Sequence, residues 1–310
     1  MQNTAQLLVI QPVNFGFNSE TAVNNSFQKN MDGDVQQQAL EEFNAFITVL
    51  INNKIDLTVI EDSAEPLTPD SIFPNNWISF HDDGRIFLYP MFAVNRRKER
   101  KSAVIETIKA NFEVKEIIDL SSSEANDLFL EGTGSMVLDR KNKIAYACLS
   151  PRTNEKILHE FCSMAGFTPI TFKAADSKGN EIYHSNVMMC IADSYAVICL
   201  ASIANDAGKK ELINSLEKTG KEIIDISLEQ LEHFAGNMLQ VKNMDDEVLL
   251  VMSTQAYHAL TTVQTATLQE HNRIIHSALN TIETVGGGSA RCMLAEIFLQ
   301  KKPPGKGGPN

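Results

Sequence analysis

A fivefold internal repeat is the feature of this 310-residue chain that most constrains its fold. Short polar or glycine-rich segments precede an apolar run at PNNWISF (74–80), EGTGSMVL (131–138), HSNVMMCI (184–191), AGNMLQV (235–241) and GGGSARCML (286–294). Their marker residues Asn76, Glu131, His184, Asn237 and Arg291 follow one another at intervals of 55, 53, 53 and 54 residues. Such regular spacing indicates one architecture built from five similar units.

Each unit has the same expected contents. The first four segments continue into two β-rich runs joined by a turn of Asp, Asn or Gly type, which is typical of a β-hairpin. An amphipathic helix follows, as in residues 100–112 and 153–167, where Thr153 is the expected N-cap and Gly166 the expected stop. A single strand then leads to the next segment, and for the last unit this strand is expected over residues 273–285.

The N-terminal region supplies the pieces needed to close a ring. Residues 35–55 are expected to form a helix and 56–62 a strand of the first unit, while LLVIQP (7–12) is expected to pair with the last unit. The predicted fold class is therefore α/β, with five ββαβ blades in a pseudo-fivefold propeller. A helix in every unit excludes an ordinary all-β propeller.

Repeats that bury their faces on one another make one domain, so residues 1–300 are expected to be a single catalytic domain. The last residues, KKPPGKGGPN (301–310), are rich in Lys, Pro and Gly and are predicted to be disordered.

Charge and composition exclude several function classes. The net charge of −12 argues against a nucleic-acid partner, which requires a basic surface. No apolar run approaches the roughly 20 residues that span a bilayer, and the N-terminus lacks the pattern of a signal peptide, so we expect a cytoplasmic protein without a membrane partner. The five cysteines show no C-x-x-C spacing, which predicts neither disulfides nor a metal site.

The marker residues offer a reactive set. If the five segments converge on the axis, the thiol of Cys292, the imidazole of His184 and the carboxylate of Glu131 meet there, as nucleophilic catalysis requires. Cys292 follows three glycines and lies beside Arg291, which favours the thiolate. The remaining cysteines occupy apolar runs and are expected to be structural: Cys148, Cys162, Cys190 and Cys199.

These motifs resemble the guanidino-group-modifying, or pentein, superfamily, which includes arginine deiminase, dimethylarginine dimethylaminohydrolase, agmatine deiminase and the amidinotransferases. The resemblance rests on GGGSARCM, His184-Ser185-Asn186 and Glu131-Gly132, and NRRKER (95–100) and LSPRTN (149–154) are similar to the dimethylarginine dimethylaminohydrolase branch.

The resemblance implies roles for individual residues. Cys292 would be the nucleophile, His184 the general acid and base, and Glu131 the carboxylate of the triad. Arg152, with Arg96 or Arg97, would hold the α-carboxylate of an amino-acid substrate. No metal or organic cofactor is implied.

The chain departs from the arginine-cleaving members at the substrate head. Where those members carry aspartates, it has Asn76 and Asn186. A neutral ureido group, which both donates and accepts hydrogen bonds, suits asparagine, whereas a buried cation without a counter-charge is costly. We therefore predict conversion of citrulline to ornithine, ammonia and carbon dioxide, although Glu131 or Asp119 could still supply a charge.

The neighbouring motif residues Asn75 and Arg291 are further candidate substrate contacts. Three alternatives stay open: a deiminase-type hydrolase acting on arginine or methylarginine, an amidinotransferase, and a binding protein of the same fold. Retention of the three reactive residues argues against the last. Self-association is left open by the sequence.

Overall fold

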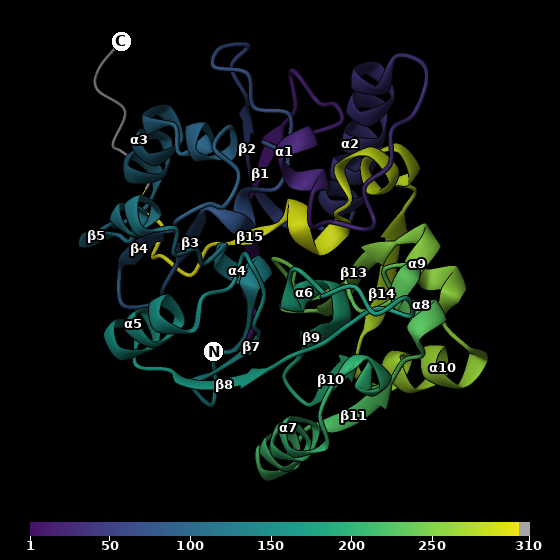
Figure 1. Cartoon of the computed structure of the whole chain (residues 1–310). Helices are drawn as coiled ribbons and strands as arrows, with labels where there is room; N and C mark the ends of the chain where they lie inside the picture. The colour runs from purple at the N-terminus through teal and green to yellow at the C-terminus, as the bar shows by residue number, and fades with distance from the viewer. Residues whose placement is uncertain (304–310) are drawn as a thin grey trace.

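Five three-stranded sheets surround a common centre in the computed structural model, which describes residues 1–303 (Figure 1). In chain order the strands are β1 (Gln6–Gln11), β2 (Asp56–Glu61), β3 (Ile78–Phe80), β4 (Arg85–Leu88), β5 (Glu116–Asp119), β6 (Met136–Asp139), β7 (Ile144–Cys148), β8 (Thr168–Phe172), β9 (Met189–Ile191), β10 (Tyr195–Ile198), β11 (Glu222–Asp225), β12 (Leu239–Lys242), β13 (Val248–Ser253), β14 (Arg273–Ser277) and β15 (Ala295–Glu296). In every sheet an antiparallel pair carries a third, parallel strand. The expected repeat is therefore confirmed.

Helices connect the paired strands to the third strand of each blade. They are α2 (Val35–Asn52), α3 (Ser102–Asn111), α5 (Glu155–Ala165), α7 (Asp206–Lys218) and the pair α9 (Thr254–Ala259) and α10 (Thr262–His271). Figure 1 shows α2, α3, α5, α7 and α10 at the rim. A parallel strand needs such a crossover to return to the sheet.

The ends of α5 follow local chemistry. The helix stops at Gly166, as expected, because this residue adopts the left-handed conformation with φ of 73°. Its N-cap is Asn154 rather than Thr153, since the Asn154 side chain accepts a hydrogen bond from the Lys156 backbone N–H.

The N-terminal region closes the ring, but its helix and second strand belong to a different blade from the expected one. β1 pairs antiparallel with β15, as expected for residues 7–12. However, α2 and β2 complete this same last blade, because β2 pairs in parallel with β1 over its full length. The first blade already has its own helix and strand in α3 and β5.

The strand expected over residues 273–285 is also shorter than predicted. β14 ends at Ser277, where its parallel register with β13 ends, and a π-helix, η5 (Ile282–Gly286), follows. The Glu42 carboxylate on α2 accepts hydrogen bonds from the backbone N–H groups of Thr281 and Ile282. Capping from a distant helix, together with burial of Ile282, explains why this apolar segment turns into a helix.

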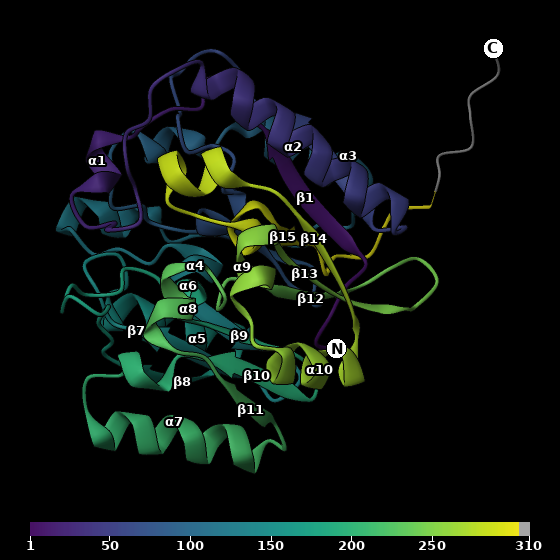
Figure 2. The ribbon, with the colours of Figure 1, turned by 90° about the vertical axis from the view of Figure 1, so that its right-hand side faces the viewer.

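The repeated polar segments form short helices near the centre. These are η1 (Pro74–Asn76), α4 (Gly132–Ser135), α6 (Ser185–Met188) and η6 (Ala290–Met293), whereas the segment at Asn237 is a turn between α8 (Leu228–Glu232) and β12. Figure 2, the view from the side, shows α4 and α6 adjacent to each other. Further short helices are α1 (Ser19–Ala22), η2 (Arg96–Glu99), η3 (Ser121–Asn126) and η4 (Leu200–Ser202).

These central segments pack backbone against backbone. A Cβ atom on Gly132 would collide with the Asn75 carbonyl oxygen, and Gly132 also has a φ of 47°. A Cβ on Gly236 would lie 2.6 Å from the Met188 backbone. Glycine is required at both positions because adjacent blades approach this closely.

The expected tail lies mostly beyond the described residues. Lys301 forms an isolated bridge with Phe112 and an ion pair with Asp56, whereas residues 304–310 fall outside the description. Among residues 1–303, no helix is both long and apolar enough to cross a membrane.

Candidate active site

Cys292 lies on η6, at the wall of a cavity near the centre of the propeller. The cavity is also lined by Asp70, Asn76, Arg96, Arg152, Tyr183, His184, Phe73, Thr21, Asn25 and the three glycines 286–288. Cys292 is 3% exposed, and its backbone N–H donates to the Ser289 carbonyl oxygen. A Cβ on Gly288 would touch the Phe73 ring at 3.0 Å, so the glycine run lets the chain pass this ring.

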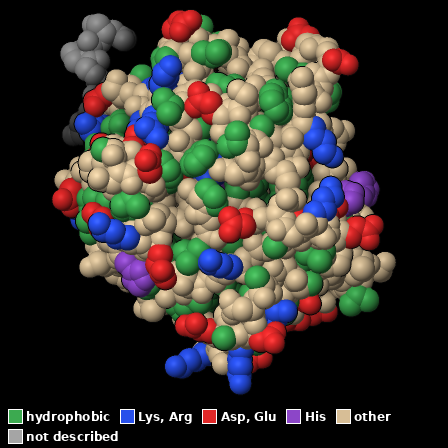
Figure 3. All heavy atoms as spheres, in the orientation of Figure 1, with side chains coloured by type: hydrophobic (Ala, Val, Ile, Leu, Met, Phe, Trp, Pro, Cys, Tyr) green, Lys and Arg blue, Asp and Glu red, His purple; other side chains and the backbone are tan. Residues whose placement is uncertain are grey.

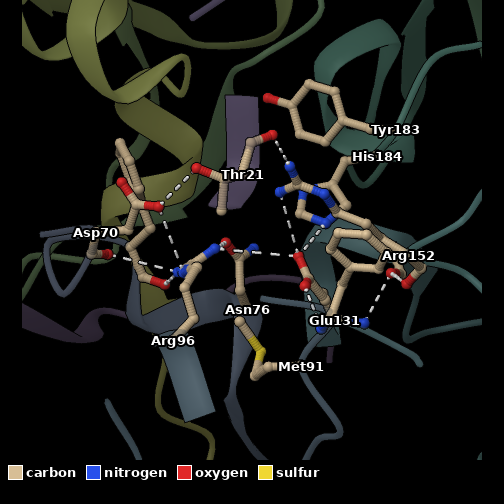
Figure 4. Close-up of polar contacts among 12 residues, drawn as sticks. Thr21, Asp70, Asn76, Met91, Arg96, Glu131, Arg152, Tyr183 and His184 are labelled. Carbon is tan, nitrogen blue, oxygen red and sulfur yellow. Dashed lines mark hydrogen bonds and ion pairs between the residues drawn. The ribbon is translucent and has the colours of Figure 1, made fainter. Parts of the chain in front are cut away.

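His184 and Glu131 meet although 53 residues separate them in sequence. The distance from His184 Nε2 to Glu131 Oε2 is 2.8 Å, while Glu131 Oε1 accepts a hydrogen bond from the Phe92 backbone N–H (Figure 4). Both side chains are almost fully buried. A carboxylate at Nε2 keeps the proton there, so that Nδ1 carries the lone pair that can accept a proton.

The pKa values of this pair follow from their surroundings. Although burial alone would raise it, the pKa of Glu131 is lowered to about 2, because Arg152, the His184 hydrogen bond and Arg96 outweigh burial. Burial, outweighing the partner carboxylate, lowers the pKa of His184 to about 4. At neutral pH the pair is therefore an ionised carboxylate and a neutral imidazole, which can act as a base.

The two arginines that line the cavity differ in how fully they are paired. Arg96 binds Glu99 through two contacts of 2.9 and 3.0 Å and donates to Asn76 Oδ1 at 2.9 Å. Arg152 instead donates to neutral oxygens, Asn24 Oδ1 and the Thr21 carbonyl, and its nearest carboxylate oxygen is on Glu131 at 3.6 Å. Arg152 therefore retains more capacity for an anionic ligand.

Arg97, the other candidate for the α-carboxylate, points elsewhere. Its guanidinium donates to the carbonyl oxygens of Met91 and Phe92 and lies 3.6 Å from Glu124. It is not among the residues that line the cavity.

Asp70 is a cavity residue that the sequence analysis missed. Its Oδ2 accepts from Asn18 Nδ2 at 2.7 Å and from Thr21 Oγ1 at 3.2 Å, whereas its buried Oδ1 has no hydrogen-bond partner among the described residues. Burial raises the pKa of Asp70, with Arg96 opposing this shift. The available signal was an acidic residue six positions before Asn76, shortly before the apolar Ile72 and Phe73.

The predicted substrate asparagines occupy different places. Asn76 lines the cavity, and its Nδ2 donates to Asn75 Oδ1 at 3.1 Å. Asn75 lies behind it, against Thr133 at 3.3 Å, and does not line the cavity. Asn186 also lies outside the lining, with its Nδ2 3.4 Å from Cys292 Sγ.

Arg291 and Asp119, the other charged residues that the sequence analysis named as candidates near the substrate, lie away from the cavity. The Arg291 side chain binds the Leu294 carbonyl and Glu296, so it points away from Cys292. Asp119 is exposed at the end of β5, where it accepts from the Ser121 backbone.

The N-terminal segment 18–25 covers one side of the cavity, which the repeat did not indicate. Asn18 binds Asp70, Asn24 binds Arg152, and Asn25 Nδ2 donates to the Gly287 carbonyl at 3.2 Å. Tyr183 adds a hydrogen bond to the same carbonyl at 2.5 Å. These contacts bring a non-repeated segment against the groups delivered by the repeat.

No group of three or more His, Cys, Asp or Glu side chains within residues 1–303 could hold a metal ion. On the face in Figure 3, acidic and basic side chains are interspersed, without a continuous basic patch.

A family model for eukaryotic N,N-dimethylarginine dimethylhydrolase matches residues 11–299 of the chain. No curated protein sequence matches it.

Solved structures show the same fold at low sequence identity. The substrate-bound N-terminal domain of a variant of ArgZ, an arginine dihydrolase of the ornithine–ammonia cycle in Cyanobacteria, has 15% identity and a TM-score of 0.74, covering 94% of this chain and 97% of that one. The complex of AgrE with ornithine and NAD⁺ has 16% identity and a TM-score of 0.75, covering 98% of this chain and 41% of that one.

A dimethylarginine dimethylaminohydrolase variant carrying an S-methyl-L-thiocitrulline adduct has 15% identity and a TM-score of 0.65, covering 95% of this chain and all of that one. The chain spans only 40% of the length of apo ArgZ. The fold is thus the five-bladed pentein fold. With a family model that spans nearly all of its length, the chain belongs to the eukaryotic N,N-dimethylarginine dimethylhydrolase family.

Proposed function

We propose that this protein hydrolyses a C–N bond in the guanidino group of free arginine or an N-methylated arginine. The family model and the names of the solved neighbours support this alternative better than the citrulline prediction. The observation that carries the proposal is the single cavity in which Cys292 and His184 meet Arg152 and Asp70, with Glu131 behind the imidazole.

The cavity offers complementary charges to a cationic amino acid. The incompletely paired guanidinium of Arg152 suits the substrate α-carboxylate. The free Oδ1 of Asp70 suits an N–H group of the cationic substrate, because a buried acceptor without a partner is costly until a donor arrives. Ionised Asp70 would supply the negative charge for which the sequence analysis had left Glu131 and Asp119 as open candidates.

The chemistry needs only this chain's groups and water. Cys292 Sγ bonds to the guanidino carbon as the thiol proton passes to His184, and His184 then protonates the departing amine as the C–N bond breaks. Water adds to the thiol-bound intermediate, gives a proton to His184, and the C–S bond breaks to restore the thiol. Arginine and water would thus give citrulline and ammonia, and a methylated arginine would give citrulline and a methylamine.

Citrulline remains a second candidate substrate because of Asn76. Arg96 occupies its Oδ1, so the amide can present only N–H to the cavity, and one of these hydrogens is already used by Asn75. The remaining N–H could donate to a ureido oxygen. In that case the products would be ornithine, ammonia and carbon dioxide.

A substrate panel tests the choice. Arginine, the methylated arginines and citrulline are incubated with the protein, and citrulline, ornithine, ammonia and methylamines are measured. We expect citrulline to form from arginine or a methylated arginine with a higher kcat/KM than ornithine forms from citrulline. Turnover of citrulline alone would overturn the proposal in favour of the second candidate, and Asn76→Asp should then weaken that turnover.

The role of Arg152 is tested separately. Arg152→Gln should raise KM at least tenfold, since a lost charge-assisted contact is worth about 1.5–3 kcal/mol. Arg97→Gln is the matched control and should leave KM near the wild-type value, because Arg97 does not line the cavity. Equal effects of the two changes would contradict the assignment of Arg152.

A further inference from the structure

The sulfur of Cys292 has two amide neighbours on the side away from the cavity. Asn186 Nδ2 lies 3.4 Å from Sγ and Asn237 Nδ2 lies 3.3 Å from it. Both asparagines are fully buried, and neither lines the cavity that Cys292 faces. The sulfur of a cavity residue therefore accepts two N–H groups from side chains that lie behind the cavity wall.

The two asparagines are held in different ways. Asn237 is fixed by the backbone, because its Nδ2 also donates to the Asn186 carbonyl at 2.7 Å and its Oδ1 accepts from the Arg291 N–H at 3.0 Å. The Asn186 side chain makes no other hydrogen bond among the described residues, and its Oδ1 is buried without a partner. A buried amide that leaves its oxygen unpaired in order to face a sulfur calls for an explanation beyond packing.

The cationic side chains near the cavity do not donate a hydrogen bond to Cys292 Sγ. His184 Nε2 is taken by Glu131, and burial keeps the pKa of the imidazole at about 4. Arg96 is paired with Glu99, Arg152 binds Asn24, and Arg291 points to Glu296. The remaining ionisable cavity groups are Asp70 and Tyr183. Across residues 1–303, the side-chain donors within hydrogen-bonding distance of Sγ are the two amides.

We propose that Asn186 and Asn237 stabilise the Cys292 thiolate by donating two N–H hydrogen bonds to its sulfur. The identity of Cys292 as nucleophile rests on the proposed function, but the contact itself does not. An N–H group interacts more strongly with an anionic sulfur than with a neutral thiol, so the two donors favour ionisation. Asn186 is then a catalytic residue that touches the reacting atom, rather than a contact to the substrate head.

The experiment follows the alkylation of Cys292 in the substrate-free protein. The rate of modification by iodoacetamide is measured against pH by mass spectrometry, and the midpoint reports the thiol pKa. Asn186→Ala removes one donor, and Asn186→Asp is nearly isosteric but places a carboxylate beside the sulfur. The proton that leaves the thiol goes to solvent in this assay and to His184 during turnover.

We expect the midpoint to rise in both variants, more in Asn186→Asp. A charged hydrogen bond of about 1.5–3 kcal/mol corresponds to roughly a ten- to hundredfold slower reaction below the midpoint. The limiting rate at high pH should stay unchanged, which separates an effect on ionisation from a loss of structure or access.

The matched control is Asn272→Ala, which removes another buried asparagine that binds Tyr195 and Gln240 and makes no hydrogen bond to the sulfur. Its alkylation profile should equal that of the wild type. An unchanged midpoint in both Asn186 variants, or an equal shift in the control, would overturn the proposal. Because no substrate is present, a shifted midpoint would support the amide pair even if the substrate panel failed.

Discussion

At the scale of single residues, the environment of each thiol separates Cys292 from the other cysteines. Burial raises the pKa of Cys148, Cys162 and Cys190 to about 12 and also raises the pKa of Cys199. Cys292 alone among the five lines the cavity with His184.

Iodoacetamide should therefore modify Cys292 first, since the thiolate is the reactive form. Peptide mapping by mass spectrometry identifies the labelled residue, and activity should fall in proportion to labelling. Cys292→Ser should abolish turnover and leave the circular-dichroism spectrum unchanged. Faster labelling of Cys162 with full activity retained would exclude Cys292 as the nucleophile.

The Glu131 carboxylate ties the reactive centre to the acid stability of the protein. Its pKa is about 2 in the folded protein and 4.5 in its ordinary state, so the unfolded chain binds more protons between these values. This group therefore contributes stability above pH 4.5 that is lost as the pH falls towards 2, about 3 kcal/mol in all.

Glu131→Gln should be less stable than the wild type at neutral pH, and the difference should shrink as the pH falls through this window. Urea unfolding at a series of pH values measures both effects. A constant difference between the two proteins at every pH would show that the loss is one of packing, not of charge.

At the scale of elements, four blades deliver a chemical group from the same place, the short segment before the first strand of the antiparallel pair. η1 carries Asn76, α4 follows Glu131, α6 follows His184 and η6 carries Cys292. The contacts between these segments depend on residues that leave room for their neighbours.

Gly134 on α4 is the clearest case. A Cβ at this position would collide with Asn76 Nδ2 and lie 2.8 Å from His184 Nδ1. Gly134→Ala should therefore displace the imidazole and reduce kcat/KM by about a hundredfold, because catalytic geometry tolerates little misplacement. Steady-state kinetics give the effect, and thermal unfolding shows how much of the protein is folded.

Gly16→Ala is the control for this change, because no atom lies within 4 Å of its Cβ position. It should keep the wild-type kcat/KM. A wild-type kcat/KM in Gly134→Ala would contradict the prediction, because it would show that catalysis does not depend on the observed position of the His184 imidazole.

At the scale of the whole molecule, the ring is closed by the pairing of β1 with β15, which joins the two ends of the chain. Glu296 on β15 lies between two arginines, with Arg291 Nη2 at 3.0 Å and Arg140 Nη2 at 3.9 Å. All three side chains are buried. One carboxylate thus balances two buried cations at the junction of the blades.

Glu296→Gln should destabilise the protein by about 3–5 kcal/mol, because it leaves buried charge without a partner. The midpoint of urea unfolding measures the loss. Asp245→Asn breaks the exposed Lys54–Asp245 pair instead and should cost less than about 1 kcal/mol. Similar losses in the two variants would show that Glu296 stabilises the protein no more than an exposed ion pair does.

The sequence by itself determined the repeated parts of this protein. Periodic apolar residues and turn signals are local, so the five blades and their helices could be predicted, as could the meeting of Cys292, His184 and Glu131 at equal positions of the repeat. The end of β14 could not, because its register with β13 and the capping by Glu42 involve residues far away in sequence.

Only the tertiary structure decided how the cavity is completed. Asp70 lies before its repeated segment, and Thr21, Asn24 and Asn25 belong to no repeat, so no spacing marked them. The structure also paired Arg96 closely with Glu99, left Arg152 with a looser ion pair of 3.6 Å to Glu131 and placed Asn186 against the sulfur. These relations depend on distances between side chains that meet only after the ring closes, and a sequence pattern records the order of residues but not those distances.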